Sequence, residues 1–261
     1  MRSLNIAATG MLAQQKNVDV ISHNIANMNT TGFKRSRAEF SDLLYQSEKR
    51  VGSATSGEGT LAPAGIQIGA GVRAAGVYTI QEQGALTQTG NRFDMAIDGR
   101  GYFRIERPDG TEAYTRAGSF QLSDQGELVT NDGFRVMPGI AIPPNAVDVN
   151  VTATGQVQVK LAGEVEFQEV GVIELANFQN EAGLEAIGSN LFLQTAASGE
   201  PLVAAPGEPG FGTLRHQFIE ASNVNAVQEI TNLISAQRAY EMNSRVIKTA
   251  DEMMSTTSQI R

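Results

Sequence analysis

Few residues in this chain are of the types that catalyse reactions or bind metals. Its 261 residues include no cysteine and only two histidines, His23 and His216. Without cysteine there are no thiolate nucleophiles or cysteine-based metal sites, and two isolated histidines fit no zinc-ligand spacing. No G-x-S-x-G segment is present to carry a nucleophilic serine. We therefore expect His23 to be an exposed helix residue and His216 to lie in a strand.

Asp94 and Asp98 are the best candidates for acid and base chemistry. They flank Met95-Ala96-Ile97, and on a strand their carboxylates would share one face. Turn and hydrogen-bond roles beside Asn91 and Gly99 are the favoured interpretation. The glycine-rich run 69–76 lacks the spacing and the lysine of a phosphate-binding loop, so it indicates strand twist or close packing instead.

The run Lys34-Arg35-Ser36-Arg37 is the one local cluster of positive charge. It could bind an acidic neighbour or a membrane surface, or it could be a solvated run after a helix. The whole chain is acidic, with a formal net charge of −8. This charge disfavours binding to nucleic acid, whose phosphates require a basic surface. No apolar run approaches the roughly 18 residues of a membrane-spanning helix, and the N-terminus has no continuous apolar segment typical of a cleaved secretory signal.

Both ends of the chain have the seven-residue spacing of apolar residues that is typical of coiled coils. Ser3 is the expected N-cap of the first helix, and residues 27–32 are expected to end it. The second helix is predicted between Val224 and Gln259, where there is no Gly or Pro, with Ser222 or Asn225 as its N-cap. The residues predicted to pack in the helices are Leu4, Met11, Val18, Ile21, Ile25, Ile230, Leu233, Tyr240, Ile247 and Met254.

The middle of the chain has the pattern of short antiparallel strands. Valine alternates with other residues in 147–151 and 157–161, and Thr154-Gly155 between them predicts a turn. Further turn sequences recur at intervals of about ten residues. Residues 46–65 include a Gly/Ser/Thr-rich stretch that can bury little apolar surface and should be a loop or an extended hairpin.

These patterns predict an α+β protein, in which the two terminal helices pair as an antiparallel coiled-coil stalk and the centre is a mostly antiparallel β domain. The helices are assigned to residues 1–30 and 222–261, and the β domain to residues 76–221. Residues 31–75 are expected to form an extended linker that contains an insertion at about 46–65.

Several motifs resemble those of the bacterial flagellar axial proteins, the rod and hook subunits. The segment Ala26-Asn27-Met28-Asn29-Thr30-Thr31-Gly32-Phe33-Lys34-Arg35 is similar to the N-terminal motif of the family. The central motifs of the family resemble residues 89–99 with 101–103 and residues 114–120 with 131–133, and its C-terminal motif resembles residues 223–225 with 235–241, in the same order. The segment from Leu44 to Arg73 resembles the insertion of the distal-rod type of subunit. The family-motif residues singled out are Ala26, Asn27, Asn29, Thr31, Gly32, Phe33 and Lys34.

The resemblance implies a structural subunit of the flagellar distal rod with no enzymatic activity and no cofactor. Such subunits polymerise helically into a drive shaft that crosses the periplasm in the basal body and transmits motor torque to the hook. Its implied partners are copies of itself, proximal rod proteins, hook protein, P-ring and L-ring proteins, a rod cap protein and the flagellar type III export apparatus, which exports the chain without a cleaved signal peptide. Inter-subunit contacts are expected from the insertion residues Gly52, Gly57, Gly59, Leu61 and Pro63.

Three alternatives remain open from the sequence. A proximal rod subunit belongs to the same family but lacks the insertion. A periplasmic enzyme would need a cleft built around Asp94 and Asp98. A monomeric adhesin or binding module would use the β domain alone.

Overall fold

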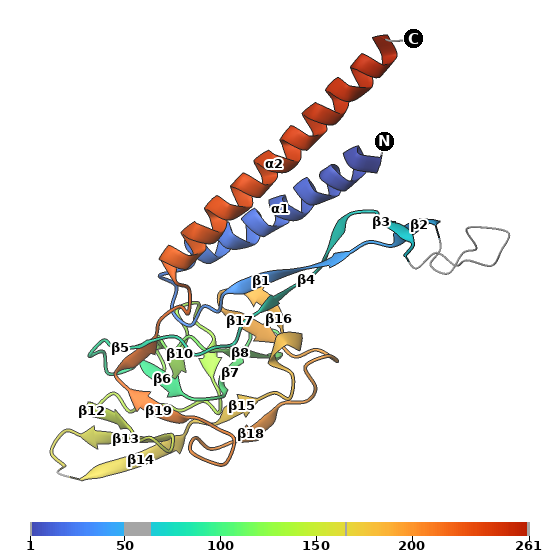
Figure 1. The fold of residues 1–261 in the computed structure, drawn as a ribbon. Helices are drawn as coiled ribbons and strands as arrows, with labels where there is room; N and C mark the ends of the chain where they lie inside the picture. The colour runs from blue at the N-terminus through green and yellow to red at the C-terminus, as the bar shows by residue number, and fades with distance from the viewer. Residues whose placement is uncertain (1, 50–63, 165, 260–261) are drawn as a thin grey trace. The chain divides into compact units, whose positions relative to one another are not determined.

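The structure is a computed structural model that describes residues 2–49, 64–164 and 166–259 (Figure 1). The chain divides into two compact units. The helical unit comprises Met1–Ala26, Ser36–Tyr78 and Asn225–Arg261, and the β unit comprises Asn27–Arg35 and Thr79–Val224. The chain therefore passes between the two units four times.

The helical unit contains α1 (Arg2–Ala26) and α2 (Ala226–Gln259), which contact each other along their lengths. Figure 1 shows them side by side in opposite directions, with both chain ends at the same end of the pair. The Asn225 side chain accepts hydrogen bonds from the backbone N–H groups of Val227 and Gln228, at 3.1 and 3.2 Å, which confirms it as the N-cap of α2. The prediction that Ser3 caps the first helix is wrong, because the helix already includes Arg2.

The helical unit also holds two pairs of strands between residues 36 and 79. These are β1 (Ser36–Asp42) with β4 (Val72–Thr79), and β2 (Tyr45–Lys49) with β3 (Ile66–Gly69). Strand β1 packs against α1. The Thr9 hydroxyl accepts a hydrogen bond from the backbone N–H of Val72 at 3.3 Å, which ties α1 to the start of β4. The segment expected to be an extended linker thus contains paired strands.

The β unit is built around a nine-stranded sheet whose described strand pairs are antiparallel. Its path runs β16-β17-β8-β7-β11-β10-β9, and β15 pairs with both β7 and β18. The short 3₁₀ helix η1 (Glu181–Gly183) precedes β16. The strands are β7 (Tyr102–Glu106), β8 (Glu112–Thr115), β9 (Gln121–Leu122), β10 (Leu128–Val129), β11 (Arg135–Val136), β15 (Leu175–Asn177), β16 (Glu185–Gly188), β17 (Leu191–Leu193) and β18 (Leu202–Ala204).

A three-stranded sheet of β12 (Ala146–Val151), β13 (Gln156–Leu161) and β14 (Phe167–Val172) packs against the same core. Val149 pairs with Val159 across the first two strands, which are joined by a turn at Gly155. The hairpin predicted from the alternating valines is confirmed. The buried valines of this sheet share one cluster with Met95, Phe103 and Phe120.

Two further strand pairs join the end of the β unit to its beginning. Strand β19 (Thr213–His216) pairs with β6 (Met95–Asp98), and β20 (Phe218–Glu220) pairs with β5 (Leu86–Gln88). His216 therefore lies in a strand, as predicted. These pairs bring residues at the end of the unit beside residues from its start, where the candidate site is found.

Gly32 illustrates how closely the backbone packs in the β unit. Its φ of +69° is a left-handed conformation, and a Cβ there would lie 2.6 Å from the backbone nitrogen of Ala117. Gly90 has a similar φ of +73°, but no atom lies within 4 Å of the position of its Cβ. The two glycines share the same backbone strain and differ in the space around them.

We expect Gly32→Ala to destabilise the β unit by more than about 3 kcal/mol, because the strain of an alanine at positive φ adds to a steric clash. The matched control Gly90→Ala should cost only about 1 kcal/mol, from the backbone strain alone. Urea unfolding followed by circular dichroism measures both. Equal losses in the two variants would contradict the close approach of Gly32 to Ala117.

Candidate functional site

The carboxylate of Glu220 is buried in the β unit between two cations. Its Oε1 atom accepts a hydrogen bond from the Lys34 ammonium, and its Oε2 atom accepts one from Arg116 Nε at 2.9 Å. The side chain of Glu220 is 0% exposed, that of Lys34 is 1% exposed and that of Arg116 is 5% exposed. A charge removed from water this completely is tolerated only when it is neutralised and hydrogen-bonded.

Backbone groups from several segments complete this cluster, which we call the Glu220 cluster (Lys34, Arg116 and Glu220). Lys34 Nζ also donates to the carbonyl oxygen of Glu82 at 2.7 Å, and the N–H of Gly84 donates to Glu220 Oε1 at 2.9 Å. Arg116 Nη1 donates to the carbonyl oxygens of Gly99 and Gly101 at 2.9 and 2.6 Å. The cluster therefore joins parts of the chain that are far apart in sequence.

Two effects on the pKa of Lys34 oppose each other in this cluster. Burial lowers the pKa of Lys34 below its ordinary value, and the Glu220 carboxylate acts in the opposite direction. Arg116 also stacks on the face of Tyr102, 6.0 Å from the ring centroid. A cleft of about 400 Å³ lies beside the cluster, with Arg100 and Glu181 in its lining. Since both Glu220 oxygens bind groups of the protein itself, the arrangement positions the chain and does not present a free acid or base.

Asn223 makes a second cross-connection close to the cluster. Its Oδ1 atom accepts from the backbone N–H of Arg35 at 2.7 Å, and its Nδ2 atom donates to the carbonyl oxygens of Ile80 and Glu82 at 2.9 and 3.0 Å. The backbone N–H of Gly32 donates to the carbonyl oxygen of Glu220 at 2.8 Å. These hydrogen bonds connect the segments near residues 34, 81 and 222. In each of these segments the chain leaves or enters the β unit.

Asp94 and Asp98 have separate structural roles. The carboxylate of Asp94 accepts hydrogen bonds from Thr89 Oγ1 at 2.6 Å and Asn91 Nδ2 at 2.9 Å. Asp98 accepts from Arg215 Nε at 2.8 Å. The interpretation as turn and hydrogen-bonding residues is confirmed by these contacts.

The two histidines have different surroundings. His216 Nε2 lies 2.8 Å from the carbonyl oxygen of Arg92, and His23 is exposed on α1. In the described parts of the chain, no three His, Asp or Glu side chains lie close enough together to hold a metal ion.

The interpretation of residues 34–37 as one solvated basic run is wrong for Lys34. This side chain is buried against Glu220, whereas Arg37 is exposed. Arg35 lies between these extremes, with its guanidinium 3.5 Å from Glu82. The sequence did not identify Glu220, whose partner Lys34 is 186 positions away. The only local sign was the place of Lys34 at the end of the N-terminal motif, directly after Gly32-Phe33.

The remaining motif residues form the exit from α1. The helix ends at Ala26, and the Thr30 hydroxyl donates to the Asn27 side chain at 3.2 Å. Asn29 is exposed, and the carbonyl oxygen of Thr31 accepts from Asn190 Nδ2 at 3.0 Å. The backbone N–H of Phe33 donates to the carbonyl oxygen of Thr30 at 3.3 Å. The expected insertion residues Gly52, Gly57, Gly59, Leu61 and Pro63 lie outside the described residues.

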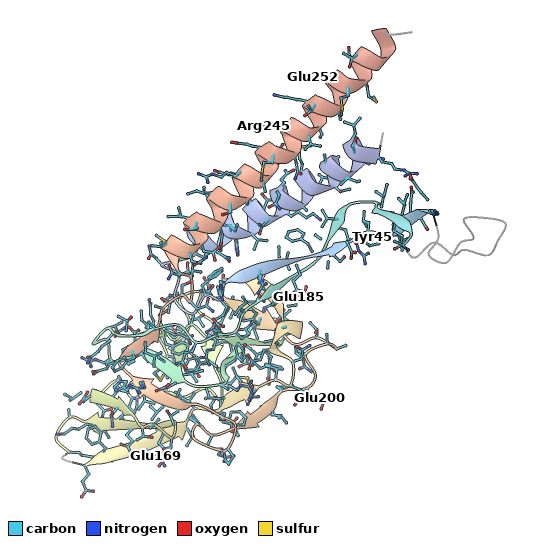
Figure 2. All side chains as sticks on the ribbon, in the orientation of Figure 1. Tyr45, Glu169, Glu185, Glu200, Arg245 and Glu252 are labelled. Atoms are coloured by element: carbon cyan, nitrogen blue, oxygen red, sulfur yellow. The ribbon has the colours of Figure 1, made fainter. Side chains whose placement is uncertain are left out.

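The ten predicted helix-packing residues are not equally covered in this chain. Ile21 is buried, and six others are half-buried, namely Leu4, Met11, Val18, Ile25, Leu233 and Ile247. Ile230, Tyr240 and Met254 are exposed. Arg245 and Glu252, labelled in Figure 2, project from α2 and are exposed as well. Much of the apolar surface of the two helices is therefore exposed in the described part of the chain. No helix in the described ranges has the length and hydropathy needed to span a membrane.

Comparison with known proteins shows which family this chain resembles. Residues 4–34 match the family model described as "Flagella basal body rod protein", residues 96–159 match "Flagellar hook protein FlgE/F/G D1 domain", and residues 215–260 match "Flagellar basal body rod FlgEFG protein C-terminal". The chain is 61% identical over 261 residues to the flagellar basal-body rod protein FlgG of Caulobacter vibrioides, covering 100% of both chains. The chain belongs to the flagellar basal-body rod protein family.

Other relatives agree with this assignment. The FlgG proteins of Agrobacterium fabrum and Bacillus subtilis are 52% and 42% identical, with 99% and 97% of each chain covered. The family model at residues 4–34 ends on Lys34, and the model at residues 215–260 includes Glu220. The Glu220 cluster therefore connects the N-terminal and C-terminal family regions.

We expect Glu220→Gln to lower the free energy of unfolding by about 3–5 kcal/mol, because it leaves two buried cations without their counter-charge. The control Asp98→Asn removes an ion pair with Arg215 that is 37% and 52% exposed. It should cost about 1 kcal/mol or less. Urea titrations at neutral pH test both variants, and a loss for Glu220→Gln no larger than that of the control would contradict the role of the cluster.

Tyr102 and Tyr114 are buried in one aromatic cluster. Their burial predicts a loss of stability at alkaline pH. Burial, reinforced by Glu112, raises the pKa of Tyr114 to about 12, and burial also raises the pKa of Tyr102. Above pH 10 the unfolded chain loses these protons before the folded chain does, so the free energy of unfolding falls as pH rises from about 10 towards 12. Tyr114→Phe should reduce this slope in urea titrations at a series of pH values, and an unchanged slope in this variant would contradict the role of Tyr114.

Proposed function

We propose that this protein is a non-enzymatic structural subunit of the flagellar distal rod, which polymerises helically into the drive shaft and transmits torque through the periplasm to the hook. The observation that carries this proposal is full-length similarity to proteins named FlgG. The relatives of that name favour the distal rod over a proximal rod subunit. The hydrogen bonds of Asp94 and Asp98 support a structural role over an enzymatic one.

The helical unit would be the polymerising part. We propose that α1 and α2 form an antiparallel coiled-coil stalk on the inner wall of the tube, where neighbouring copies cover the remaining faces. Exposed apolar side chains on α2 support this proposal, because Val227 is 76% exposed and Met242 is 60% exposed. Head-to-tail contacts that do not close on themselves generate a helical polymer. Neighbouring subunits would then cover those of the ten packing residues that are exposed or half-buried in one chain, whereas Ile21 is already buried.

The acidic charge of the chain supports a different role for the β unit. The helical unit has 10 basic and 9 acidic residues, a formal charge of +1, so the β unit has a formal charge of −9. A charged, well-solvated unit is suited to the outside of a polymer. The proposed contacts with proximal rod proteins, hook protein, P-ring and L-ring proteins and the rod cap protein follow from the position in the basal body, as does type III export.

The segment at about 46–65 would reach a neighbouring subunit and stiffen the shaft. The two residues directly before this segment support the proposal, since Leu44 is 88% exposed and Tyr45 is 59% exposed. Large apolar side chains this open to water are more stable when another surface covers them.

Deleting the gene from its host should give basal structures whose rod stops early and carries no hook, because the distal shaft cannot assemble. Electron microscopy of purified basal structures measures this. A complete rod without a hook would indicate a hook subunit instead. Normal flagella would contradict the proposal and favour a binding module.

Deleting residues 52–60 should give a rod that is no longer straight and stiff, because contacts between neighbouring subunits are lost. The matched control replaces the same residues with a Gly/Ser sequence of equal length, which separates chain length from residue identity. Images of purified rods give the curvature. An unchanged straight rod in the deletion variant would remove the stiffening role.

A further inference from the structure

The fully buried residues of α1 and α2 are mostly small or polar, with Ile21 as the large apolar exception. The buried residues of α1 are Ala7, Ala13, Ile21 and Asn24, and those of α2 include Glu229, Ala236 and Ala250. Large apolar side chains are exposed elsewhere on the helices, among them Leu12, Val227, Ile230, Ile234, Met242, Val246 and Met253. Apolar burial alone therefore gives little reason for one alignment of the helices over another.

Two specific contacts connect α1 and α2. Asn24 Nδ2 lies 3.4 Å from Glu229 Oε2, and both side chains are buried. At the other contact, Gly10 faces Asn243 so closely that a Cβ on Gly10 would lie 2.8 Å from Asn243 Nδ2. One contact is a polar pair, and the other is a close approach of the Asn243 side-chain amide to Gly10.

Both contacts belong to one antiparallel alignment. Gly10 lies two heptads before Asn24, and Asn243 lies two heptads after Glu229. The same alignment places Asn17 opposite Ala236 and Ser3 opposite Ala250. A slip of one heptad in either direction would separate Asn24 from Glu229 and leave the Glu229 carboxylate without this buried partner.

Asn24 also forms two hydrogen bonds with Ser36, which lies outside α2. Its Oδ1 atom accepts a hydrogen bond from the backbone N–H of Ser36, and its Nδ2 atom donates to the Ser36 carbonyl oxygen, both at 2.8 Å. These bonds attach the end of α1 to the start of β1 and orient the amide towards Glu229. Glu229 lies in the first turn of α2, where the helix dipole stabilises a carboxylate.

We propose that the Asn24–Glu229 pair and the Gly10–Asn243 contact set the register of the helix pair. A single polar position of this kind can fix alignment in coiled coils at some cost in stability. The register keeps the large apolar rows on the outside of the pair, available to a second copy of the chain. This last step rests on the proposed function, whereas the register does not.

Cysteine cross-linking can read the register directly, because the chain has no cysteine of its own. The matched pairs are Ser3→Cys with Ala250→Cys and Asn17→Cys with Ala236→Cys. The mismatched pair, Ser3→Cys with Ala236→Cys, is displaced by two heptads, or about 21 Å along the helix. A disulfide requires Cα atoms within about 7 Å. Each variant is expressed as the full chain in cells lacking the native gene and oxidised there, and gel mobility separates disulfides within one chain from those between chains.

Within one chain, the matched pairs should cross-link and the mismatched pair should not. Adding Asn24→Leu with Glu229→Leu should lower the matched yields by about fivefold or more, because apolar residues accept several alignments. Gln15→Leu with Gln237→Leu is the matched control, since both glutamines are exposed, and it should leave the yields unchanged. Unchanged yields after removal of the Asn24–Glu229 pair, or equal yields from the mismatched pair, would overturn the proposal.

The Gly10 contact gives an independent test. Gly10→Ala should reduce the matched cross-links, and adding Asn243→Ala should restore them, because the shorter side chain makes room for the new Cβ. Failure of this rescue would remove Gly10 and Asn243 from the mechanism.

Swimming is scored for every variant. If the cysteine-free chain fails to restore swimming, the proposed function fails, whereas normal swimming with unchanged cross-links in the Asn24/Glu229 variant counts against the register alone.

Discussion

The fully buried carboxylate of Glu220 places a strong constraint on how the β unit folds. Glu220 has lost contact with water, so its charge is stable only when Lys34, Arg116 and the backbone of Gly84 are all in place. Each of these groups lies in a different segment of the chain. The carboxylate therefore forces those segments to fold together, since an arrangement lacking one partner leaves a buried charge uncompensated. Asn223 extends this requirement to the segments that pass between the units.

The two units are stabilised in different ways. The β unit has one large apolar cluster and a smaller aromatic cluster in which Tyr114 and Phe178 meet edge to face, with ring centroids 4.8 Å apart. The fully buried residues of the two helices are mostly small or polar, with Ile21 as the exception, and many larger apolar residues are exposed. Burial of a large side chain contributes about 1.5–3 kcal/mol to the free energy of unfolding. The helical unit of one chain is therefore less stable than it would be if these side chains were covered. This is the distribution expected of a protein that folds alone in one part and assembles through the other.

The regular elements could be predicted from the sequence because their signals are local. The absence of Gly and Pro from residue 224 to residue 259, together with the cap at Asn225, defined α2 closely. The valine alternation and Gly155 predicted the β12–β13 hairpin for the same reason. The Ser3 cap was wrong because capping residues are also tolerated within a first turn.

Long-range features could not be predicted in this way. The seven-residue spacing identified five packing residues on α1, but which side of a helix faces a partner depends on the partner, and only Ile21 of the five is fully buried. The burial of Lys34 depends on Glu220, which no local pattern connects to it. Sequence similarity to the family located the motif without indicating that its lysine is buried.

The discontinuous make-up of the helical unit has a consequence for the order in which the protein can form. Helix α1 is made first, but α2 is the last element of the chain, with the whole β unit between them. At a synthesis rate of about 5–20 residues per second, α1 waits for on the order of ten seconds or more before its partner exists. A helix that waits this long would be prone to non-specific association if its whole surface were strongly apolar. The alanine, glycine and asparagine residues along α1 limit that risk, so the composition that weakens the finished pair also protects the unfinished chain.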